Sequence, residues 1–337
     1  MVAAITHFKE IPVIDIGPLV ERDASVKDRQ RTADEIGTAS RRMGLFYIKN
    51  HGIPESHREE MFAEMKRFFA LPEAEKMRLH IGNSSQFRGY VPLCGEVTQE
   101  KKDWHECLDI QPKKHAGGDA ADTGAVETGH AGRHPLDDPE QWPHGLPSFR
   151  EVMMRTWDEK KYLSEKITEA LALSLGLDAQ FFKTYAGDEL CDLRLLHYPP
   201  YEGTHDPGEV DAGMGAHYDH GFATVLSQDE AGGLDVLNED GRWILAPHIP
   251  GTYLVNLGVM MQRWTNDRYR ATLHRVQLPD ARRQRYSIAF FNEPRYDALV
   301  EPLAVCCDAD HPPGYAPCLF GEYLSGLFSK AYNKPLE

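Results

Sequence analysis

The spacing of apolar and polar residues predicts an N-terminal region of alternating strands and helices. Residues 11–16 alternate in the manner of a short strand, and residues 45–49 form a second apolar run of strand length. Between them, Ser25 and Asp28 have the spacing of a capping box, and apolar residues recur at helical intervals until Gly44. We therefore expect a strand, a helix and a second strand in this order.

Two further helices are predicted by the same pattern. Ser56 and Glu59 have the spacing of an N-cap and its N3 partner, and the apolar face that follows ends before Pro72. Residues 149–175 form a long amphipathic segment that is followed by Gly176, a typical helix stop. We expect this long helix to support a sheet.

The chain changes character after residue 193, where short β-like runs are separated by Gly, Pro, Asn and Asp. Regularly spaced short strands of this kind predict a barrel or a jelly roll. Together with the helices, they indicate a mixed α+β fold. The predicted strands are LRLLHY at 193–198, ATVLSQ at 223–228, LDVLN at 234–238, TYLVNL at 252–257, ATLHRVQL at 271–278 and RYSIAFF at 285–291.

The segment at 113–135 is rich in Gly, Ala, Asp and His and has almost no large apolar residue. Such a composition predicts either a solvated insertion or a mobile loop over a site. We therefore divide the chain into an N-terminal region at 1–110, a flexible insertion and linker at 111–148, and a catalytic core at 149–337 that contains the supporting helix. The three parts are expected to form one structural unit.

Composition excludes several classes of protein. The 337 residues include 37 basic and 52 acidic residues, for a formal charge of −15, so a general nucleic-acid binder with a basic face is not expected. The chain has no run of eighteen apolar residues, so no membrane span is predicted, and the N-terminus does not resemble a secretory signal. The six cysteines form no CxxC pair. These features lead us to expect a cytoplasmic protein.

A candidate metal site is formed by His217 and Asp219, which are separated by Tyr218. If the three residues lie in a strand, His217 and Asp219 share one face and Tyr218 points away. His274 offers a third ligand. Two histidines and one carboxylate form a facial triad, which is typical of Fe(II) oxygenases because it leaves coordination positions open. Sixteen histidines also supply accidental partners, so the pattern is weak evidence without its context.

That context is a candidate carboxylate site eleven residues after His274. Arg285 and Ser287 would lie on one face of a strand, with Tyr286 on the other. A guanidinium pairs bidentately with a carboxylate, and the hydroxyl adds a further donor. Because an unpaired buried guanidinium is costly, we expect either an acidic side chain or a ligand carboxylate opposite Arg285.

These motifs together resemble the Fe(II)/2-oxoglutarate-dependent oxygenases of the isopenicillin N synthase-like family. The resemblance spans about residues 10 to 335, in the order and spacing of that family. The segments that carry it include IPVIDIG at 11–17, GLFYIKNHGIP at 44–54, FFALPEAEK at 68–76, RGYVP at 88–92, LRLLHYPP at 193–200 and NLGVMMQRWTNDRYRATLHRV at 256–276.

The resemblance implies a double-stranded β-helix core, with catalytic iron held by the three residues of the predicted triad. It also implies that the far carboxylate of 2-oxoglutarate binds Arg285 and Ser287, with Tyr198 as a further contact; a core aromatic is an equal interpretation of Tyr198. The implied reaction consumes O₂ and 2-oxoglutarate, releases succinate and CO₂, and hydroxylates, desaturates or cyclises a substrate. His220, beside the triad, is interpreted as an outer or structural residue, unless the strand ends before it.

A narrower resemblance to the bacterial ethylene-forming enzymes suggests substrate-binding residues. It rests on GEVT at 95–98, on Arg194 and on the tail FGEYLSGLF at 320–328. It implies that Glu96 holds a cationic group and Arg194 an anionic one, and Arg88 is a third candidate. An exposed loop acid is the alternative interpretation of Glu96. The expected partner is a small amino-acid-like or natural-product substrate, while the oligomeric state cannot be inferred from the sequence.

Three alternatives remain open at this point. The same clamp occurs in isopenicillin N synthase, so an Fe(II) oxidase that does not use 2-oxoglutarate would fit. A zinc hydrolase could use the same two histidines and one aspartate. A binding protein could keep the jelly roll without any metal.

Overall fold

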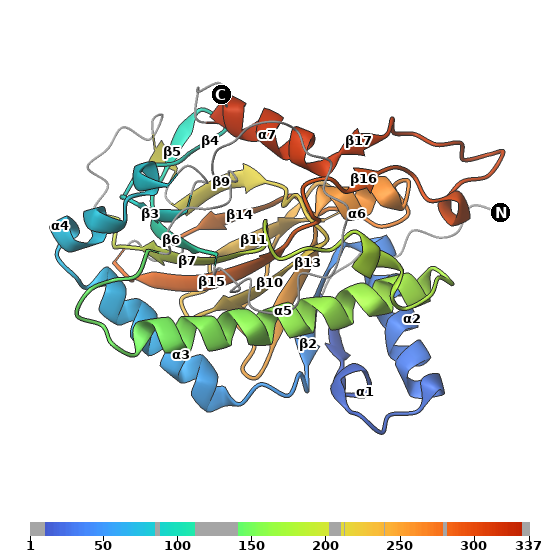
Figure 1. The fold of residues 1–337 in the computed structure, drawn as a ribbon, viewed down its shortest axis with the longest axis horizontal. Coiled ribbons are helices and arrows are strands. Elements are labelled where there is room, and N and C mark those ends of the chain that lie inside the picture. Colours follow the sequence, from blue (N-terminus) through green and yellow to red (C-terminus); the bar gives the residue numbers. More distant parts are fainter. Residues whose placement is uncertain are drawn as a thin grey trace, which may run out of the picture.

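Two β-sheets face each other at the centre of the protein (Figure 1). The computed structural model describes residues 11–84, 88–111, 141–201, 210–211, 213–238, 240–278 and 282–331. Within these ranges, the larger sheet has eight strands in the order β1-β2-β13-β10-β15-β7-β6-β3, and the smaller has four in the order β12-β11-β14-β9. The predicted mixed α+β fold with a jelly-roll core is confirmed.

The strands of the larger sheet are β1 (Val13–Asp15), β2 (Leu45–Lys49), β3 (Gly89–Val91), β6 (Glu106–Ile110), β7 (Asp192–Tyr198), β10 (Ala223–Gln228), β13 (Tyr253–Leu257) and β15 (Arg285–Asn292). The smaller sheet contains β9 (Gly213–His217), β11 (Leu234–Leu237), β12 (Trp243–Leu245) and β14 (His274–Gln277). Short accessory strands are β4 (Val97–Thr98), β5 (Lys101–Asp103), β8 (Val210–Asp211), β16 (Leu299–Val300) and β17 (Cys318–Leu319).

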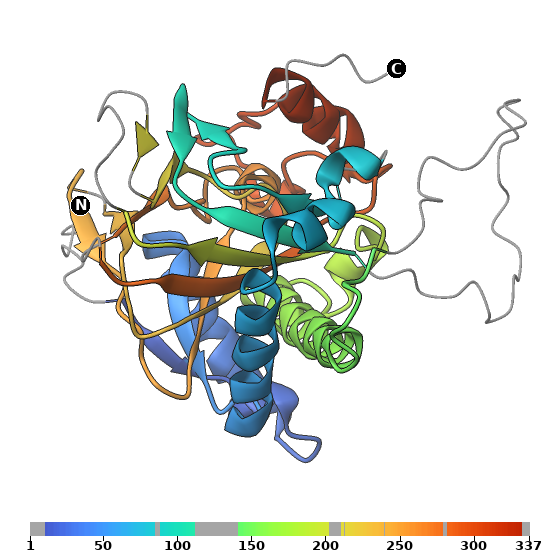
Figure 2. The same cartoon turned by 90° about the vertical axis from the view of Figure 1, so that its left-hand side faces the viewer.

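The helices cover opposite sides of the sheets. The long helix α5 contacts α2, α3 and strands β10 and β15, so it supports the larger sheet as expected. Figure 2 shows α3 and α5 on one side of this sheet and α7 on the other. The helices are α1 (Gly17–Val20), α2 (Val26–Arg42), α3 (Glu55–Phe69), α4 (Glu73–Lys76), α5 (Phe149–Ser174), α6 (Val259–Trp264) and α7 (Phe320–Ala331), with 3₁₀ turns at Met77–Leu79, Ile81–Asn83, Phe181–Thr184 and Ala304–Cys306.

The observed helix ends can be compared with the capping residues predicted from the sequence. Ser25 is the N-cap of α2, where its hydroxyl accepts a hydrogen bond from the Asp28 backbone N–H at 3.1 Å. The prediction for Ser56 is wrong, because α3 begins at Glu55 with Pro54 as its N-cap residue. The fixed φ of proline starts this helix without a side-chain cap. Gly176 follows α5 with φ of +74°, a conformation that glycine adopts without strain.

Strand β15 separates two cores. Tyr286, Ile288 and Phe290 point into the apolar core beneath the helices. Arg285 and Ser287 point the other way, into the space between the two sheets. This alternation agrees with the predicted faces of the strand.

Strands from the first 110 residues pair with later ones, β2 with β13 and β6 with β7. The division at 1–110, 111–148 and 149–337 stays a prediction, and the expected loop at 113–135 lies outside the described residues. None of the helices in the described part of the chain is long and apolar enough to cross a bilayer.

Lys160 on α5 is expected to make the free energy of unfolding depend on pH. Its Nζ is buried and donates to Ser227 Oγ (2.8 Å) and to the carbonyl of Val225 (3.2 Å). Burial lowers the pKa of this amine from 10.5 to about 7. The unfolded chain therefore binds more protons between these values, so the stability that the neutral amine contributes at high pH is lost as the pH falls through this window.

We expect Lys160→Met to remove this dependence. The free energy of unfolding of the variant, relative to that of the wild type, should rise as the pH falls from about 10 to about 7. Urea denaturation at several pH values measures this difference. A difference that does not change with pH would contradict the assignment.

Candidate active site

His217 and His274 are brought together by the pairing of two strands of the smaller sheet. His217 ends β9, His274 begins β14, and the two positions are direct partners in the antiparallel ladder. Their ring centroids are 4.3 Å apart. The Nε2 atom of each histidine lies 3.7 Å from Asp219 Oδ1, so the predicted triad converges on one point.

Asp219 reaches this point from a turn, which corrects the strand prediction. Strand β9 ends at His217, and residues 218–220 are not part of a strand. The turn is held against the start of α6, where the N–H of Val259 donates to the carbonyl of Asp219 at 2.8 Å and the N–H of Met260 donates to that of His220 at 2.8 Å. Backbone contacts at a helix start therefore set the position of the carboxylate. Tyr218 points away, and its side chain is largely exposed.

In each of the three residues, the polar atom that points away from the triad forms a hydrogen bond with a neighbouring group. His217 Nδ1 lies 2.9 Å from the carbonyl of Gly215, and His274 Nδ1 lies 3.0 Å from the carbonyl of Thr272. Only a protonated Nδ1 can donate to a carbonyl, so in the neutral imidazole this contact leaves the lone pair on Nε2.

The carboxylate of Asp219 is oriented in the same way. Its Oδ2 accepts hydrogen bonds from Thr224 Oγ1 at 2.5 Å and Asn256 Nδ2 at 2.6 Å, which leaves Oδ1 directed at the histidines. Neither Thr224 nor Asn256 was identified from the sequence. The only available signal was a polar residue within each of two apolar strands.

The electrostatics suit a metal ion. Burial, with a further contribution from His274, lowers the pKa of His217 to about 4, so its imidazole is neutral. Burial opposes ionisation of Asp219, but the two histidines and the hydrogen bonds to Oδ2 outweigh it and lower the pKa of this carboxyl. Two donors, each about 2.1 Å from a metal ion, are at most about 4.2 Å apart. The separation of 3.7 Å therefore fits a bound metal.

Arg285 lies deeper between the sheets and is buried with its exposed fraction at 1%. Its Nε donates to the carbonyl of Gly232 at 2.8 Å, and its Nη1 donates to Ser287 Oγ at 2.9 Å. Tyr198, directly opposite on β7, places its ring 4.7 Å from the guanidinium carbon. Within the described residues no carboxylate forms an ion pair with Arg285. Of the two partners expected from the sequence, a ligand carboxylate is therefore the one that fits.

One cavity of about 1490 Å³ connects these features. The inward residues of β7 line it, with Tyr198 beside Arg285 and Arg194 toward the opposite end, because alternate residues of a strand share one face. The triad lies on the wall contributed by the smaller sheet. The cavity is thus large enough for a co-substrate and a small substrate together.

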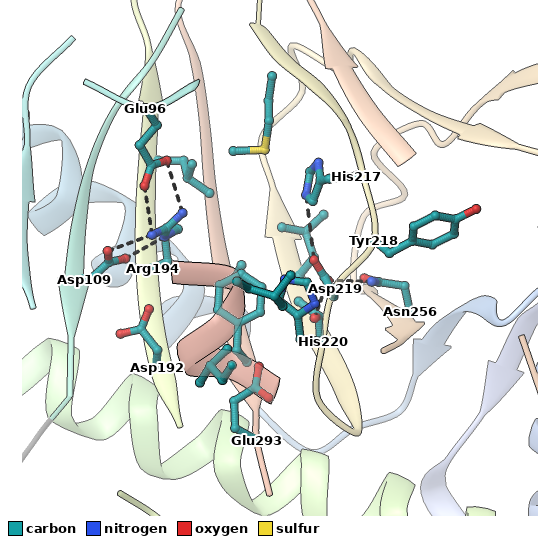
Figure 3. Close-up of a pocket in the computed structure, with 18 of the residues that line it drawn as sticks. Glu96, Asp109, Asp192, Arg194, His217, Tyr218, Asp219, His220, Asn256 and Glu293 are labelled. Carbon is teal, nitrogen blue, oxygen red and sulfur yellow. Dashed lines mark hydrogen bonds and ion pairs between the residues drawn. The ribbon is translucent and has the colours of Figure 1, made fainter. Parts of the chain in front are cut away.

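The predicted substrate residues Glu96 and Arg194 line this cavity and bind each other (Figure 3). Arg194 donates from Nε and Nη2 to both oxygens of Asp109, at 2.6 and 2.8 Å, and from Nη1 and Nη2 to Glu96 at 3.3 and 3.2 Å. Burial opposes ionisation of Glu96, but Arg194 and His105 lower its pKa to about 2. The side chain of Glu96 is mostly buried, so it is not an exposed loop acid.

Two other residues from the sequence interpretation also line the cavity. Arg88 is partly buried, and its Nη2 donates to the carbonyl of Glu189 at 3.3 Å. His220 lies beside the triad, past the end of β9, and its buried Nδ1 forms no hydrogen bond with a described group. The substrate roles of Arg88, Glu96 and Arg194 stay predictions.

Comparison with known proteins agrees with this geometry. Residues 11–145 match the N-terminal family of non-haem dioxygenases in morphine synthesis, and residues 190–294 match the 2OG-Fe(II) oxygenase superfamily. The chain is 36% identical to a homoarginine-6-hydroxylase of Oryza sativa subsp. japonica, over 95% of this chain and 96% of that protein. It is 34% identical to a homoarginine-6-hydroxylase of Arabidopsis thaliana, with the same coverage of 95% and 96%.

A solved structure has the same fold. The full-length Neurospora crassa protein crystallised with alpha-KG (2-oxoglutarate) and thymine superposes with a TM-score of 0.79 at 29% identity, over 96% of each chain. The chain described here belongs to the 2OG-Fe(II) oxygenase superfamily. It is an oxidoreductase whose cofactor is Fe(II) and whose co-substrates are 2-oxoglutarate and O₂.

Proposed function

We propose that His217, Asp219 and His274 bind the iron, and that Arg285 and Ser287 bind the far carboxylate of 2-oxoglutarate. The observation that carries the proposal is the orientation of the three ligand atoms. Two histidine Nε2 atoms and Asp219 Oδ1 converge, while hydrogen bonds occupy the remaining polar atom of each side chain. Hydrogen-bonded ligands of this kind are pre-oriented for a metal.

The bound iron would supply activation of O₂, coupled to oxidative decarboxylation of 2-oxoglutarate. The surrounding residues hold the reactants in place. Arg285 and Ser287 fix one end of the co-substrate, and the ring of Tyr198 packs against the guanidinium. Burial raises the pKa of Tyr198 to about 12, so its hydroxyl stays protonated and can donate a hydrogen bond. Apolar cavity residues, including Leu196, Leu254 and Phe291, exclude water from the site.

The reaction is proposed to be hydroxylation of a small amino-acid-like substrate. Support comes from the relatives named as homoarginine-6-hydroxylases, which align with nearly the whole chain. Support also comes from the charged end of the cavity, where Glu96, Asp109 and Arg194 provide groups of both signs. Homoarginine is therefore the first substrate to test.

The purified protein, with Fe(II) and 2-oxoglutarate in air, is expected to release succinate, and homoarginine should stimulate this release. Labelled 2-oxoglutarate and mass spectrometry follow the co-substrate and the added oxygen atom. Substrate oxidation without succinate would favour an oxidase that does not use 2-oxoglutarate. Anaerobic titration of the iron-loaded protein with 2-oxoglutarate should produce a weak visible charge-transfer band. Its absence would favour a hydrolase or a binding protein.

A further inference from the structure

Two carboxylates on one wall of the cavity each have an oxygen atom without a well-aligned donor. They are Asp192 Oδ1 and Glu293 Oε2, which are buried without a well-aligned donor among the described groups, although the Asp192 carboxyl lies beside Asp109 and that of Glu293 beside the backbone N–H of Gly221. Both residues line the same cavity as the triad. A buried acceptor without a donor is costly, so such a pair indicates a ligand that donates hydrogen bonds.

The strand register brings the two acids to the same face. Asp192 begins β7 directly opposite Phe291 on β15, and Glu293 lies two residues beyond Phe291. Figure 3 shows Asp192 below the ion pairs of Arg194, and Glu293 below Asp219 and His220. The exposed fraction of Glu293 is only 8%. The acids therefore line the cavity on one side of both the Arg194 cluster and the triad.

The formal charge of this wall is negative even though Arg194 lies on it. Its Nε, Nη1 and Nη2 all donate to Asp109 or Glu96, so the guanidinium is already shared by two carboxylates. Apart from the triad and Arg285, the cavity is lined by six carboxylate residues and two arginines: Glu96, Asp109, Glu189, Asp192, Glu293 and Asp297, with Arg88 and Arg194. A cation is the complementary ligand for this end of the cavity.

The protonation of the two acids is consistent with such a ligand. Burial and the adjacent Asp109 raise the pKa of Asp192 well above its ordinary value. Burial, together with the charge of Asp219, raises the pKa of Glu293 to about 8. Without a cation nearby, the ionised form of each acid is therefore disfavoured, and a bound cation would stabilise it.

We propose that Asp192 and Glu293 bind a cationic group of the substrate, a guanidinium or an ammonium. In this proposal Arg194 holds Asp109 and Glu96 in position, whereas the sequence interpretation assigned it to an anionic group of the substrate. This inference rests on the proposed function and deepens it, because it names the charge of the substrate and the residues that select it.

The test compares a cation with its neutral counterpart. Homoarginine carries a guanidinium, and homocitrulline carries an uncharged urea group of nearly the same shape. Isothermal titration of the anaerobic complex with Fe(II) and 2-oxoglutarate measures the affinity of both. We expect the wild type to bind homoarginine at least about 10-fold more tightly than homocitrulline. Asp192→Asn and Glu293→Gln should each reduce this preference by about 10-fold or more and leave homocitrulline binding unchanged.

Asp297→Asn provides the matched control. Asp297 also lines the cavity, but its carboxylate is largely exposed and pairs with Arg295 at 2.7 Å. This variant should keep the preference of the wild type. Thermal unfolding and circular dichroism verify that each variant is folded, and succinate release by Asp297→Asn in the absence of substrate should stay at the wild-type level.

The outcomes separate the two hypotheses. If the wild type prefers no guanidinium or ammonium amino acid over its neutral counterpart, the inference is wrong. The same conclusion follows if Asp192→Asn and Glu293→Gln keep the full preference. In either case, succinate release and the charge-transfer band would still support the iron and 2-oxoglutarate sites. Loss of those two signals in the wild type would instead contradict the proposed function.

Discussion

Replacement of Asp219 by alanine is expected to abolish both iron binding and turnover. Asp219 supplies the one negative charge of the triad, and its Oδ1 lies 3.7 Å from both histidine Nε2 atoms. Loss of an outer partner of a metal ligand typically reduces affinity or activity by about 10- to 100-fold. Removal of the ligand itself should exceed this range, and it also leaves Thr224 and Asn256 without their acceptor.

Two measurements distinguish this effect from unfolding. Anaerobic equilibrium dialysis gives the iron affinity, and labelled 2-oxoglutarate gives the rate of succinate formation. Asp235→Ala is a suitable control, because Asp235 lies in the sheet that carries His217 and His274 and pairs with Arg275 at 3.3 Å, outside the triad. The control should keep the wild-type iron affinity and the wild-type rate of succinate formation. An Asp219→Ala protein that still binds iron and releases succinate would show that the triad assignment is wrong.

Arg285→Leu is expected to produce the second large effect, a rise in the KM for 2-oxoglutarate. Arg285 is buried and lines the cavity, and it forms no ion pair with a described carboxylate. Loss of one partner of a buried ion pair costs about 3 kcal/mol or more, which corresponds to roughly a 150-fold change in affinity. Most of the lost activity should return at high 2-oxoglutarate concentration, because the variant keeps all three proposed iron ligands.

Two further variants complete this experiment. Ser287→Ala should raise the same KM by a smaller factor, about 10-fold, since it removes one hydrogen bond. Arg275→Leu is the matched control, because this guanidinium stacks on Trp243 and pairs with Asp235 away from the cavity. Steady-state succinate release over a range of 2-oxoglutarate concentrations gives each KM. A wild-type KM in Arg285→Leu would overturn the proposed carboxylate site.

Local rules predicted much of the fold. The apolar runs at 193–198, 223–228 and 285–291 lie within strands β7, β10 and β15, because alternating burial leaves a regular pattern in the sequence. The error at Ser56 shows the limit of the capping rule. A serine two residues after Pro54 can sit inside the first turn, and the pattern does not distinguish that position from a cap.

The partners of the charged cavity residues could not be predicted from short stretches of sequence. Arg194 lies on the cavity face of β7, but its partner Asp109 lies 85 residues earlier in the chain. Only the pairing of β6 with β7 brings the two together. The free oxygens of Asp192 and Glu293 were equally invisible, since a missing partner is a property of the whole environment.

The sequence by itself determined the kinds of donors and the faces of the strands that carry them. His217, His274, Arg285 and Ser287 follow from residue chemistry and a two-residue period, which are local properties. The tertiary structure decided how these groups work together. It placed Asp219 on a turn against α6, oriented each residue of the triad by a neighbour, and paired Arg194 with Asp109 and Glu96 while leaving one oxygen each of Asp192 and Glu293 without a well-aligned donor. These outcomes depend on contacts between distant segments, which the sequence pattern does not specify.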